Sequence, residues 1–595
     1  MGGIFGAYSR SRPVAPLIRM GLERLVHRGV DGAGIATMHN GKIFVKKDVG
    51  KVTDVHKKVN LDDLPGYVGI GHVRSATHGR PAYENTHPVQ DCKGELALVM
   101  DGVVAGYDEL RRVLIKKHNL SSRTDAEALA HMVEDELSGG LNIVEAIAKV
   151  ARRVRGYFTF ALLKAGDENI YAVSMGNPLV IGVGEGEYFI SSEEQALVDR
   201  VSSVYYLEPG MMAIVGPGGV KILDVETLRE VGQRPRGITR YQYEIVKGAF
   251  SHYMVKEIYE EPEALARSIN LLQREYVNDA ANLVSKARSI IMTGSGTSYH
   301  ALLIGKYYLE SIAGVRVEAI PAGEFIYSGL RLVEPGTLII ALSQSGESVD
   351  IIRAVRMAKR RGGVILGIVN RLGSTLMRES NVYLPMGAGP EMAVPATKTF
   401  VASLSILLQL ASSVVGKLDE ARAMLSEAVG KLMNQLDDLR EQARKVSRRV
   451  SGSQNAYVIS GGPWGLPMAM EASLKLKEAA QIYAEALNFR EFKHGPITLV
   501  SEGLPTVAIF PGGDIDDEVL NVASEVWARG GLVISIARRD FKASGDYVIS
   551  IEPTSSEYTM PIIYASAIQL LAYEAGVAKG VDVDNPRNLS KVVTT

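Results

Sequence analysis

The sequence predicts an α+β domain followed by two α/β domains, each built on a doubly wound parallel sheet. First, 595 residues are too many for one core at about 100–200 residues per domain. Second, short apolar runs alternate with Gly-rich turns up to about residue 235. Third, from about residue 285, strand-like runs alternate with long helical patterns, as in βαβ units, and the same order occurs twice.

The first region, residues 1–235, is the α+β domain. Its strand-like runs include GKIFVKK, ELALVMDG, YFTFALLKAG and GMMAIVGPGG, and helical patterns lie near residues 16–27 and 125–136. The next segment, residues 236–275, is basic, polar and aromatic at its start. We interpret it as a linker.

The repeat defines the two remaining domains, which we place at residues 276–415 and 445–585. ARSIIMTGSGTSYHALLIGKYYLE is similar to QNAYVISGGPWGLPMAMEASLKLKE, and RGGVILGIV is similar to RGGLVISIA. The two members of each pair occupy corresponding positions in the first and second copies. Residues 586–595 form a C-terminal tail beyond the second copy.

The charge balance argues against nucleic acid as a partner. Lys and Arg number 66 and Asp and Glu 67, so the chain lacks the basic excess that phosphate backbones attract. Cys92 is the single cysteine, which excludes intramolecular disulfides and favours a cytoplasmic protein. The apolar stretch near residues 404–415 is short and contains Gln409, so we expect a buried helix and no membrane span.

Two hydroxyl-rich turns in the first copy predict a phosphate site. Both follow an apolar strand and precede a helix, at the edge where open parallel sheets bind ligands. Hydroxyls and backbone N–H groups at helix starts suit a phosphate, and the lysine of a nucleotide P-loop motif is missing. The alternative is that these residues only cap helices. The second copy has GGPWG and FPGGD instead, so we expect one site per chain. The candidates are Thr297, Ser298, Ser343, Gln344, Ser345 and Ser348.

Three other segments carry reactive groups. Lys475 and Glu478 are spaced i,i+3 on a predicted helix, His494 lies in a Gly/Pro-bounded turn, and Lys591 lies in the tail. Taken singly, each is better explained as a surface pair, a loop residue or a solvated lysine.

No metal or organic cofactor is predicted. His72, His78 and His87 might suggest a metal, but no Cys or acidic partner lies at ligand spacing. We expect these histidines to have structural and ligand-contact roles.

The whole chain resembles the glutamine–fructose-6-phosphate aminotransferases (isomerizing). The strings that match this family, in family order, are RGVDGAG, GHVRSATHG, NTHPV, RTDAEALAH, HYMVKEIYEEP, GSGTSY, SQSGES, PATKTF, LKLKE, EFKHGP and DVDNPRNLSKVVT. The resemblance implies a glutaminase domain of the N-terminal-nucleophile type followed by two sugar isomerase (SIS) domains. It also implies synthesis of glucosamine 6-phosphate from fructose 6-phosphate.

The resemblance assigns roles to the candidate residues. The Ser and Gln residues of the two turns would bind the sugar phosphate, and backbone near Val394 would line the sugar. Lys591 would form a Schiff base with the ketose, and Glu478, assisted by Lys475, would move a proton between C1 and C2. His494 would help to open the sugar ring from a neighbouring subunit, which implies a homodimer.

The glutaminase half departs from the family at its chemical groups. The family begins Met-Cys-Gly and uses that cysteine as nucleophile, whereas this chain has Gly2. Cys92 is a poor substitute because no free α-amine lies beside it. Asp101 replaces the asparagine that donates to the oxyanion, and an ionised carboxylate can only accept. Ser75 stands where a tryptophan linked to ammonia gating is usual.

The residues that hold glutamine are partly retained, so this domain is expected to fold and to keep an amino-acid pocket. They are Arg74, Thr77, His78, Gly102 and Asp125. We therefore expect a glucosamine-6-phosphate synthase homologue that uses free ammonia or ammonia from a separate glutaminase subunit, rather than glutamine. Two alternatives stay open: a glucosamine-6-phosphate deaminase running in reverse, and a non-catalytic sugar-phosphate-binding regulator. The retained Lys475, Glu478, His494 and Lys591 argue against the regulator.

Overall fold

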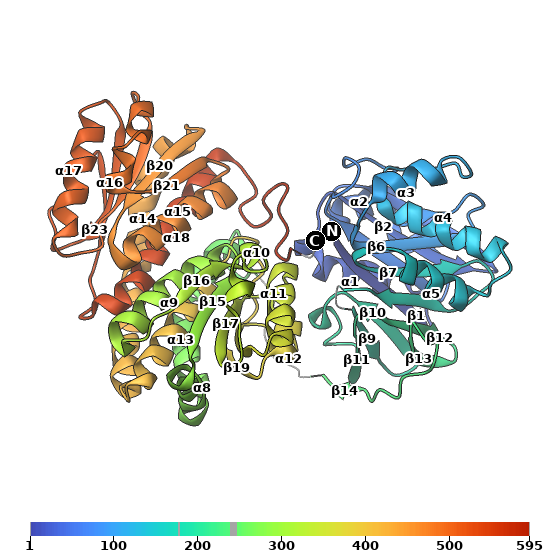
Figure 1. Cartoon of the computed structure of the whole chain (residues 1–595). Coiled ribbons are helices and arrows are strands. Elements are labelled where there is room, and N and C mark those ends of the chain that lie inside the picture. The colour runs from blue at the N-terminus through green and yellow to red at the C-terminus, as the bar shows by residue number, and fades with distance from the viewer. Residues whose placement is uncertain (1, 177–178, 239–246, 594–595) are drawn as a thin grey trace. The chain divides into compact units, whose positions relative to one another are not determined.

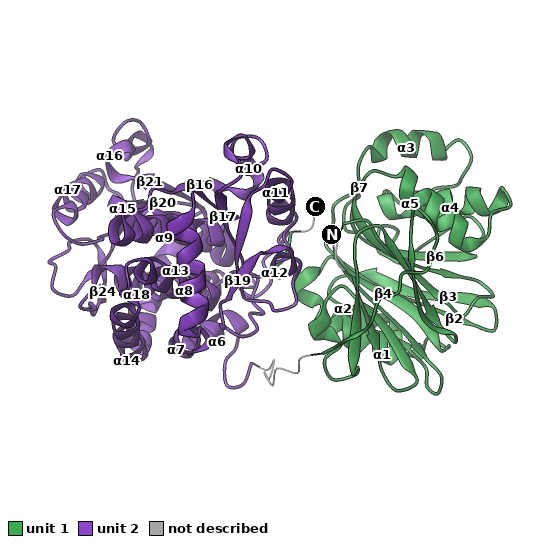
Figure 2. Ribbon diagram, turned by 60° about the horizontal axis from the view of Figure 1, so that its bottom comes forward, with its two compact units in different colours: residues 1–242, 590–595 green, residues 243–589 purple. Residues whose placement is uncertain are grey.

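A computed structural model describes residues 2–176, 179–238 and 247–593, and the chain divides into two compact units. Unit 1 contains residues 1–242 together with 590–595, and unit 2 contains residues 243–589 (Figure 2). Unit 1 is therefore discontinuous in sequence, because the chain returns to it at the end.

Unit 1 is built on two antiparallel sheets, in agreement with the predicted α+β class. The first has the order β14 (Arg236–Gly237), β11 (Ser203–Leu207), β9 (Leu179–Val183), β10 (Glu187–Ser191), β1 (Gly2–Ser9), β4 (Val68–Arg74), β2 (Gly32–His39) and β3 (Lys42–Val49). The second has the order β13 (Gly219–Asp224), β12 (Met211–Gly216), β8 (Ile170–Ser174), β7 (Gly156–Lys164), β6 (Leu96–Val104) and β5 (Val89–Gln90).

The two sheets of unit 1 pack face to face, and helices cover their outer faces. Ile4 and Ile70 of the first sheet share an apolar core with Val99 of the second, as alternation along each strand allows. Helices α1 (Ala15–Arg24) and α2 (Val52–Val59) cover the first sheet. Helices α4 (Asp125–Ser138) and α5 (Ile143–Arg153) cover the second. The result is a four-layer α/β/β/α arrangement.

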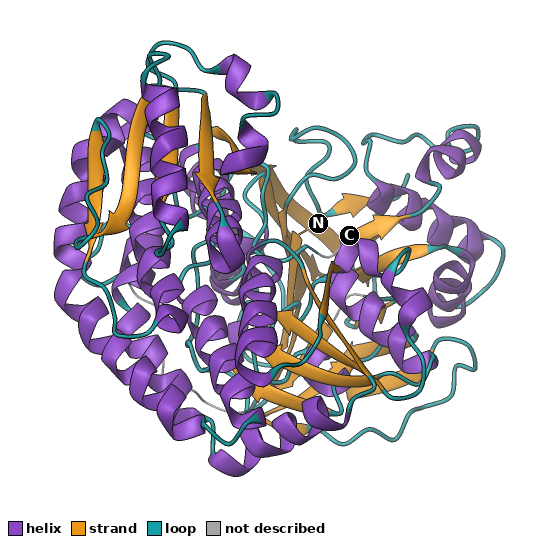
Figure 3. Cartoon of the chain, turned by 60° about the vertical axis from the view of Figure 1, so that its left-hand side comes forward, coloured by secondary structure: helices purple, strands orange, loops and turns teal. Residues whose placement is uncertain are grey.

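Unit 2 contains two five-stranded sheets in which every pairing is parallel, as predicted from the repeat. Figure 3 shows their strands among the helices of the chain. The first sheet has the order β16 (Glu318–Pro321), β15 (Ser289–Gly294), β17 (Thr337–Ser343), β18 (Val364–Val369) and β19 (Val382–Pro385). The second has the order β21 (Tyr483–Asn488), β20 (Asn455–Ser460), β22 (Pro505–Ile509), β23 (Leu532–Arg538) and β24 (Tyr547–Ile551).

Both sheets share the order 2-1-3-4-5, so each has one switch point between its first and third strands. Helices lie on both faces of the first sheet: α9 (Thr297–Ala313) and α13 (Lys398–Val414) on one side and α11 (Val349–Arg360) on the other (Figure 1). In the second sheet, α15 (Gly462–Ala480) follows β20 and α17 (Ile515–Trp527) follows β22.

Much of the predicted linker is part of unit 2, which corrects the assignment of residues 236–275. Residues 239–246 lie outside the described residues, but α6 (Tyr253–Tyr259) and α7 (Glu261–Leu271) are helical. Their apolar side chains, such as Val255, Ile258 and Leu265, are fully buried in the main core of the unit. The helical pattern was missed because basic and aromatic residues precede α6.

The most apolar helices are core helices of unit 2. As predicted, the apolar stretch around residues 404–415 lies in a buried helix, α13. One segment, residues 557–579, is long and apolar enough to cross a membrane by composition, but 94% of its apolar window is buried inside the protein. It ends in α18 (Met560–Lys579), which packs on the long α14 (Leu418–Ser451) and on α15.

Candidate functional site

The two hydroxyl-rich turns meet at the switch point of the first parallel sheet. One joins β15 to α9 and the other joins β17 to α11, and β15 pairs directly with β17. Thr297 and Ser298 therefore lie at the same sheet edge as Ser343, Gln344, Ser345 and Ser348. This is the edge at which ligands bind in such sheets.

The turn after β17 is held by its own hydroxyls. Ser343 Oγ accepts the Gly346 N–H at 3.0 Å, and Ser345 Oγ accepts the Glu347 N–H at 3.2 Å. Gly346 has φ +67°, and a Cβ there would lie 2.2 Å from Ser374 Oγ, so glycine is needed. The turn is thus preorganised at the N-terminus of α11, where a phosphate is favoured.

In the second sheet, the corresponding turn joins β22 to α17, and a carboxylate of this chain accepts one of its backbone N–H groups. Asp516 is buried, and its Oδ1 accepts the Gly512 N–H at 2.7 Å. An anion already bonded to the turn competes with a phosphate. This contact supports the expectation of one phosphate site per chain.

A buried charged network joins the two SIS domains beside the first turn. Lys475 on α15 is fully buried, and its Nζ lies 2.5 Å from Glu478 Oε2 and 3.1 Å from Thr297 Oγ1 on α9. Burial alone lowers the pKa of Lys475, but the charges of Glu471 and Glu478 outweigh it and raise that pKa above its ordinary value. Lys475 is therefore a fixed cation rather than a proton donor near neutral pH.

Sequence reasoning missed two members of this network, Glu471 and His300. Glu471 is fully buried one turn before Lys475. Its Oε1 accepts from Thr297 at 3.0 Å and lies 3.3 Å from Lys475 Nζ, while its Oε2 lies 2.7 Å from His300 Nδ1. The i,i+4 spacing of Glu471 and Lys475 was readable in the sequence, but the contacts to α9 were not.

The other predicted sugar-site residues lie on three separate segments of the chain. The Val394 N–H donates to the Asp584 carbonyl oxygen at 2.8 Å, and Val394 itself is buried. His494 is exposed in the turn between α16 (Phe489–Phe492) and the 3₁₀ helix at Pro496–Leu499. Lys591 belongs to unit 1, where its backbone N–H donates to the His27 carbonyl oxygen at 3.2 Å.

The predicted glutamine-holding residues line one pocket in unit 1. Arg74, Thr77, His78, Gly102 and Asp125 all contribute to it, and Ser75 lies at its wall. Arg74 Nη2 donates to the His78 carbonyl oxygen at 2.6 Å, whereas its buried Nη1 has no hydrogen-bond partner among the described residues. A buried N–H donor of this kind suits the carboxylate of an amino acid.

Asp125 orders the other side of this pocket. Its Oδ2 accepts the Val104 N–H at 2.9 Å and lies 3.3 Å from His78 Nδ1. The neighbouring Asp125 carboxylate raises the pKa of His78, while partial burial opposes that rise. Cationic and anionic groups thus face each other across the pocket, as an α-amino acid requires.

Packing leaves no room for a side chain at position 2. A Cβ on Gly2 would lie 2.3 Å from the Val73 carbonyl oxygen and 2.5 Å from His72 Nε2. The Gly2 N–H donates to Asp101 Oδ1 at 2.9 Å, and Asp101 Oδ2 accepts from Arg28 Nη2 at 2.7 Å. Asp101 is therefore a buried acceptor that is paired with the buried guanidinium of Arg28.

Comparisons with known proteins identify the class of both units. A family model described as a glutamine amidotransferase domain matches residues 73–199, and one described as a SIS domain matches residues 283–413 and again 450–578. The chain is therefore a glutamine amidotransferase domain joined to a pair of SIS domains.

Curated relatives then define the family. Proteins from Pyrobaculum aerophilum, Thermococcus kodakarensis and Aquifex aeolicus are 38%, 36% and 37% identical over 100% of both chains. Each is named glutamine–fructose-6-phosphate aminotransferase (isomerizing). The chain belongs to this enzyme family, as its motifs predicted.

Solved structures agree for the second half of the chain. The C-terminal domain of glucosamine-fructose-6-phosphate aminotransferase from Francisella tularensis is 31% identical, with a TM-score of 0.52, over 58% of this chain and 100% of that one. A tagatose-6-phosphate ketose/aldose isomerase from Escherichia coli is 20% identical with a TM-score of 0.50, over 58% of this chain and 98% of that one. The second likeness extends to the fold alone.

Proposed function

We propose that the chain makes glucosamine 6-phosphate from fructose 6-phosphate with ammonia rather than glutamine as the nitrogen donor. Relatives in the family are named for glutamine and fructose 6-phosphate, and this chain carries the candidate catalytic residues Lys475, Glu478, His494 and Lys591. One observation carries the ammonia proposal: Gly2 has neither a thiol nor room for one, and Asp101 occupies the oxyanion side of the same centre.

The sugar half is proposed to work through residues at the switch point and in the tail. The turns carrying Ser298, Ser343, Gln344, Ser345 and Ser348 bind the phosphate, and backbone near Val394 lines the sugar. The amine of Lys591 condenses with the C2 carbonyl and releases water. Ammonia then displaces the lysine and leaves an imine at C2.

The isomerisation step is assigned to Glu478, which takes a proton from C1 and returns it to C2. The buried Lys475 holds that carboxylate in place and stabilises its anionic form. His494 assists ring opening. Because its side chain is exposed, it can reach the sugar site of a second copy in a homodimer. The amino-acid pocket of unit 1 is proposed to bind glutamine without hydrolysing it.

The test is to measure glucosamine 6-phosphate formation from fructose 6-phosphate with ammonium chloride and with glutamine in parallel. We expect product with ammonium and only background with glutamine. Product with glutamine would mean that another group replaces the thiol. The reverse reaction alone would indicate a deaminase, and binding without turnover in either direction would indicate a regulator. The ammonia proposal fails in each of these three cases.

Restoring a cysteine alone is not expected to restore glutamine use. In Gly2→Cys, the new side chain collides with Val73 and His72, and overpacking of this kind destabilises a fold by about 1–3 kcal/mol. Glutamine-dependent product should stay at background, and the thermal unfolding midpoint should fall. Gly218→Cys is the matched control because a Cβ there meets open space. Glutamine hydrolysis by Gly2→Cys would show that the nucleophile position is accessible.

A further inference from the structure

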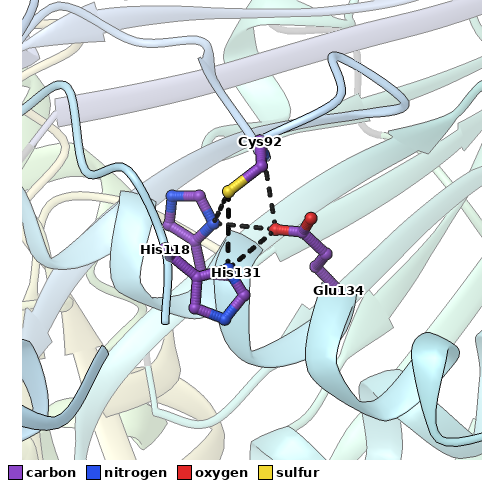
Figure 4. Close-up of side chains that lie close together, drawn as sticks. All are labelled: Cys92, His118, His131 and Glu134. Carbon is purple, nitrogen blue, oxygen red and sulfur yellow. Dashed lines mark hydrogen bonds and ion pairs between the residues drawn. The ribbon is translucent and has the colours of Figure 1, made fainter. Parts of the chain in front are cut away.

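Four side chains that can ligate a metal converge in unit 1 from three separate segments (Figure 4). Cys92 lies in the turn between β5 and β6, and His118 follows α3 (Tyr107–Leu114). His131 and Glu134 lie on α4 with i,i+3 spacing, which places them on one helix face. The four ligand atoms all lie within 4.8 Å of one another.

The atoms surround a common centre. Cys92 Sγ lies 3.4 Å from His118 Nδ1 and 3.7 Å from His131 Nδ1. Glu134 Oε2 lies 2.9 Å from His131 Nδ1 and 3.2 Å from His118 Nδ1. The same carboxylate oxygen therefore faces both imidazole rings and the thiol.

These separations fit a tetrahedral zinc ion. Zinc bonds of about 2.3 Å to sulfur and about 2.0–2.1 Å to nitrogen or oxygen, at tetrahedral angles, place sulfur about 3.6 Å from nitrogen. The same geometry places two nitrogen or oxygen ligands about 3.3–3.4 Å apart. The two observed sulfur–nitrogen distances, 3.4 and 3.7 Å, lie on either side of the ideal sulfur–nitrogen distance. The two observed nitrogen–oxygen distances, 2.9 and 3.2 Å, are shorter than the ideal distance between two nitrogen or oxygen ligands.

An outer contact orients the His118 ring for metal binding. His118 Nε2 lies 3.1 Å from Asp135 Oδ1, so it can donate outward and leave the Nδ1 lone pair facing the centre. His131 is buried, and its Nε2 lies 4.0 Å from Glu127 Oε1, beyond hydrogen-bond distance. A carboxylate behind the distal nitrogen, as at His118, is usual for a histidine that binds a metal, because it fixes the tautomer.

We propose that Cys92, His118, His131 and Glu134 form a structural zinc site. The sequence analysis expected no metal centre, because it considered other histidines and found no Cys or acidic partner at ligand spacing. Cys92 precedes His118 and His131 by 26 and 39 residues, so only folding brings the three together. The ion would fasten the β5–β6 turn and the segment after α3 onto α4. That helix begins at Asp125, which lines the amino-acid pocket, so the metal would stabilise the pocket without taking part in the sugar chemistry.

The experiment uses the full chain without a histidine tag and measures zinc by elemental analysis after exhaustive dialysis. The metal-free chain is then titrated with Co²⁺ as a spectroscopic probe. We expect about one zinc per chain and, with Co²⁺, the intense d–d bands of a tetrahedral ion plus a thiolate charge-transfer band. Cys92→Ser and His118→Gln should lose zinc, and Asp135→Asn should bind it about 10–100-fold more weakly.

Two controls keep the result decisive. His39→Gln removes a histidine at the end of β2, away from the cluster, and should retain zinc and the cobalt spectrum. Cys92 is exposed, so Cys92→Ser should remain folded, and its circular dichroism checks this. The proposal is overturned if the full chain retains no zinc and gives no tetrahedral cobalt spectrum. It is also overturned if Cys92→Ser binds both metals as the unmodified chain does.

Discussion

Replacing Glu478 with glutamine is expected to lower kcat for glucosamine 6-phosphate formation by about 10²–10⁴-fold, the usual contribution of a positioned general base. Glutamine keeps the size of the side chain but cannot take a proton from C1. Lys475 would still be held by Glu471, so the fold and the phosphate turns should be little disturbed. The KM for fructose 6-phosphate should therefore change far less than kcat.

The measurement is steady-state kinetics with saturating ammonium, together with a thermal unfolding curve. Glu441→Gln is the matched control, since Glu441 is an exposed residue of α14 paired with Lys445. Its kinetics should equal those of the unmodified chain. If Glu478→Gln kept the full kcat, the proton transfer would have to be assigned to another group.

Replacing Glu471 with leucine is expected to destabilise unit 2 by about 3–5 kcal/mol, because it removes one partner from a buried ion pair. Lys475 would remain buried with only Glu478 to balance its charge. His300 and Thr297 would also lose their acceptor, so the link between α9 and α15 would weaken. Activity should fall as well, because Glu478 is positioned by the same lysine.

Denaturant unfolding of the full chain would measure this effect. Glu471→Gln should be milder, since an amide can still accept from Thr297. The double variant Glu471→Gln with Lys475→Met should recover part of the stability, because it removes a buried cation that has lost one of its two carboxylate partners, but not the activity. Equal stability of Glu471→Leu and the unmodified chain would show that the network contributes nothing to the fold.

The parts of the fold that depend on local pattern could be predicted from the sequence. The strand–turn–helix repeats gave the two parallel sheets, and the two hydroxyl-rich turns were placed at one sheet edge because parallel strands end together. Helices α6 and α7 were missed because their apolar residues follow a basic, aromatic stretch typical of linkers.

The contacts that join distant segments could not be predicted. Glu471 reaches His300 across 171 residues, and Cys92 meets His131 across 39. Neither pair carries a spacing signal, because each depends on how helices and turns pack. The closure of the Gly2 position likewise depends on Val73 and His72 of β4, the neighbouring strand of the first sheet.

The discontinuity of unit 1 has a consequence for biosynthesis. Ser590 Oγ donates to the Arg28 carbonyl oxygen, and the Lys591 N–H donates to the His27 carbonyl oxygen. The first of these donors is made 562 residues after its acceptor. At about 5–20 residues per second, the ribosome needs some tens of seconds to make the intervening unit. Unit 1 therefore acquires these contacts only after the whole of unit 2 has been made. The same pairing means that a fragment beginning at residue 243 would carry Lys591 without the surface on which its backbone is held.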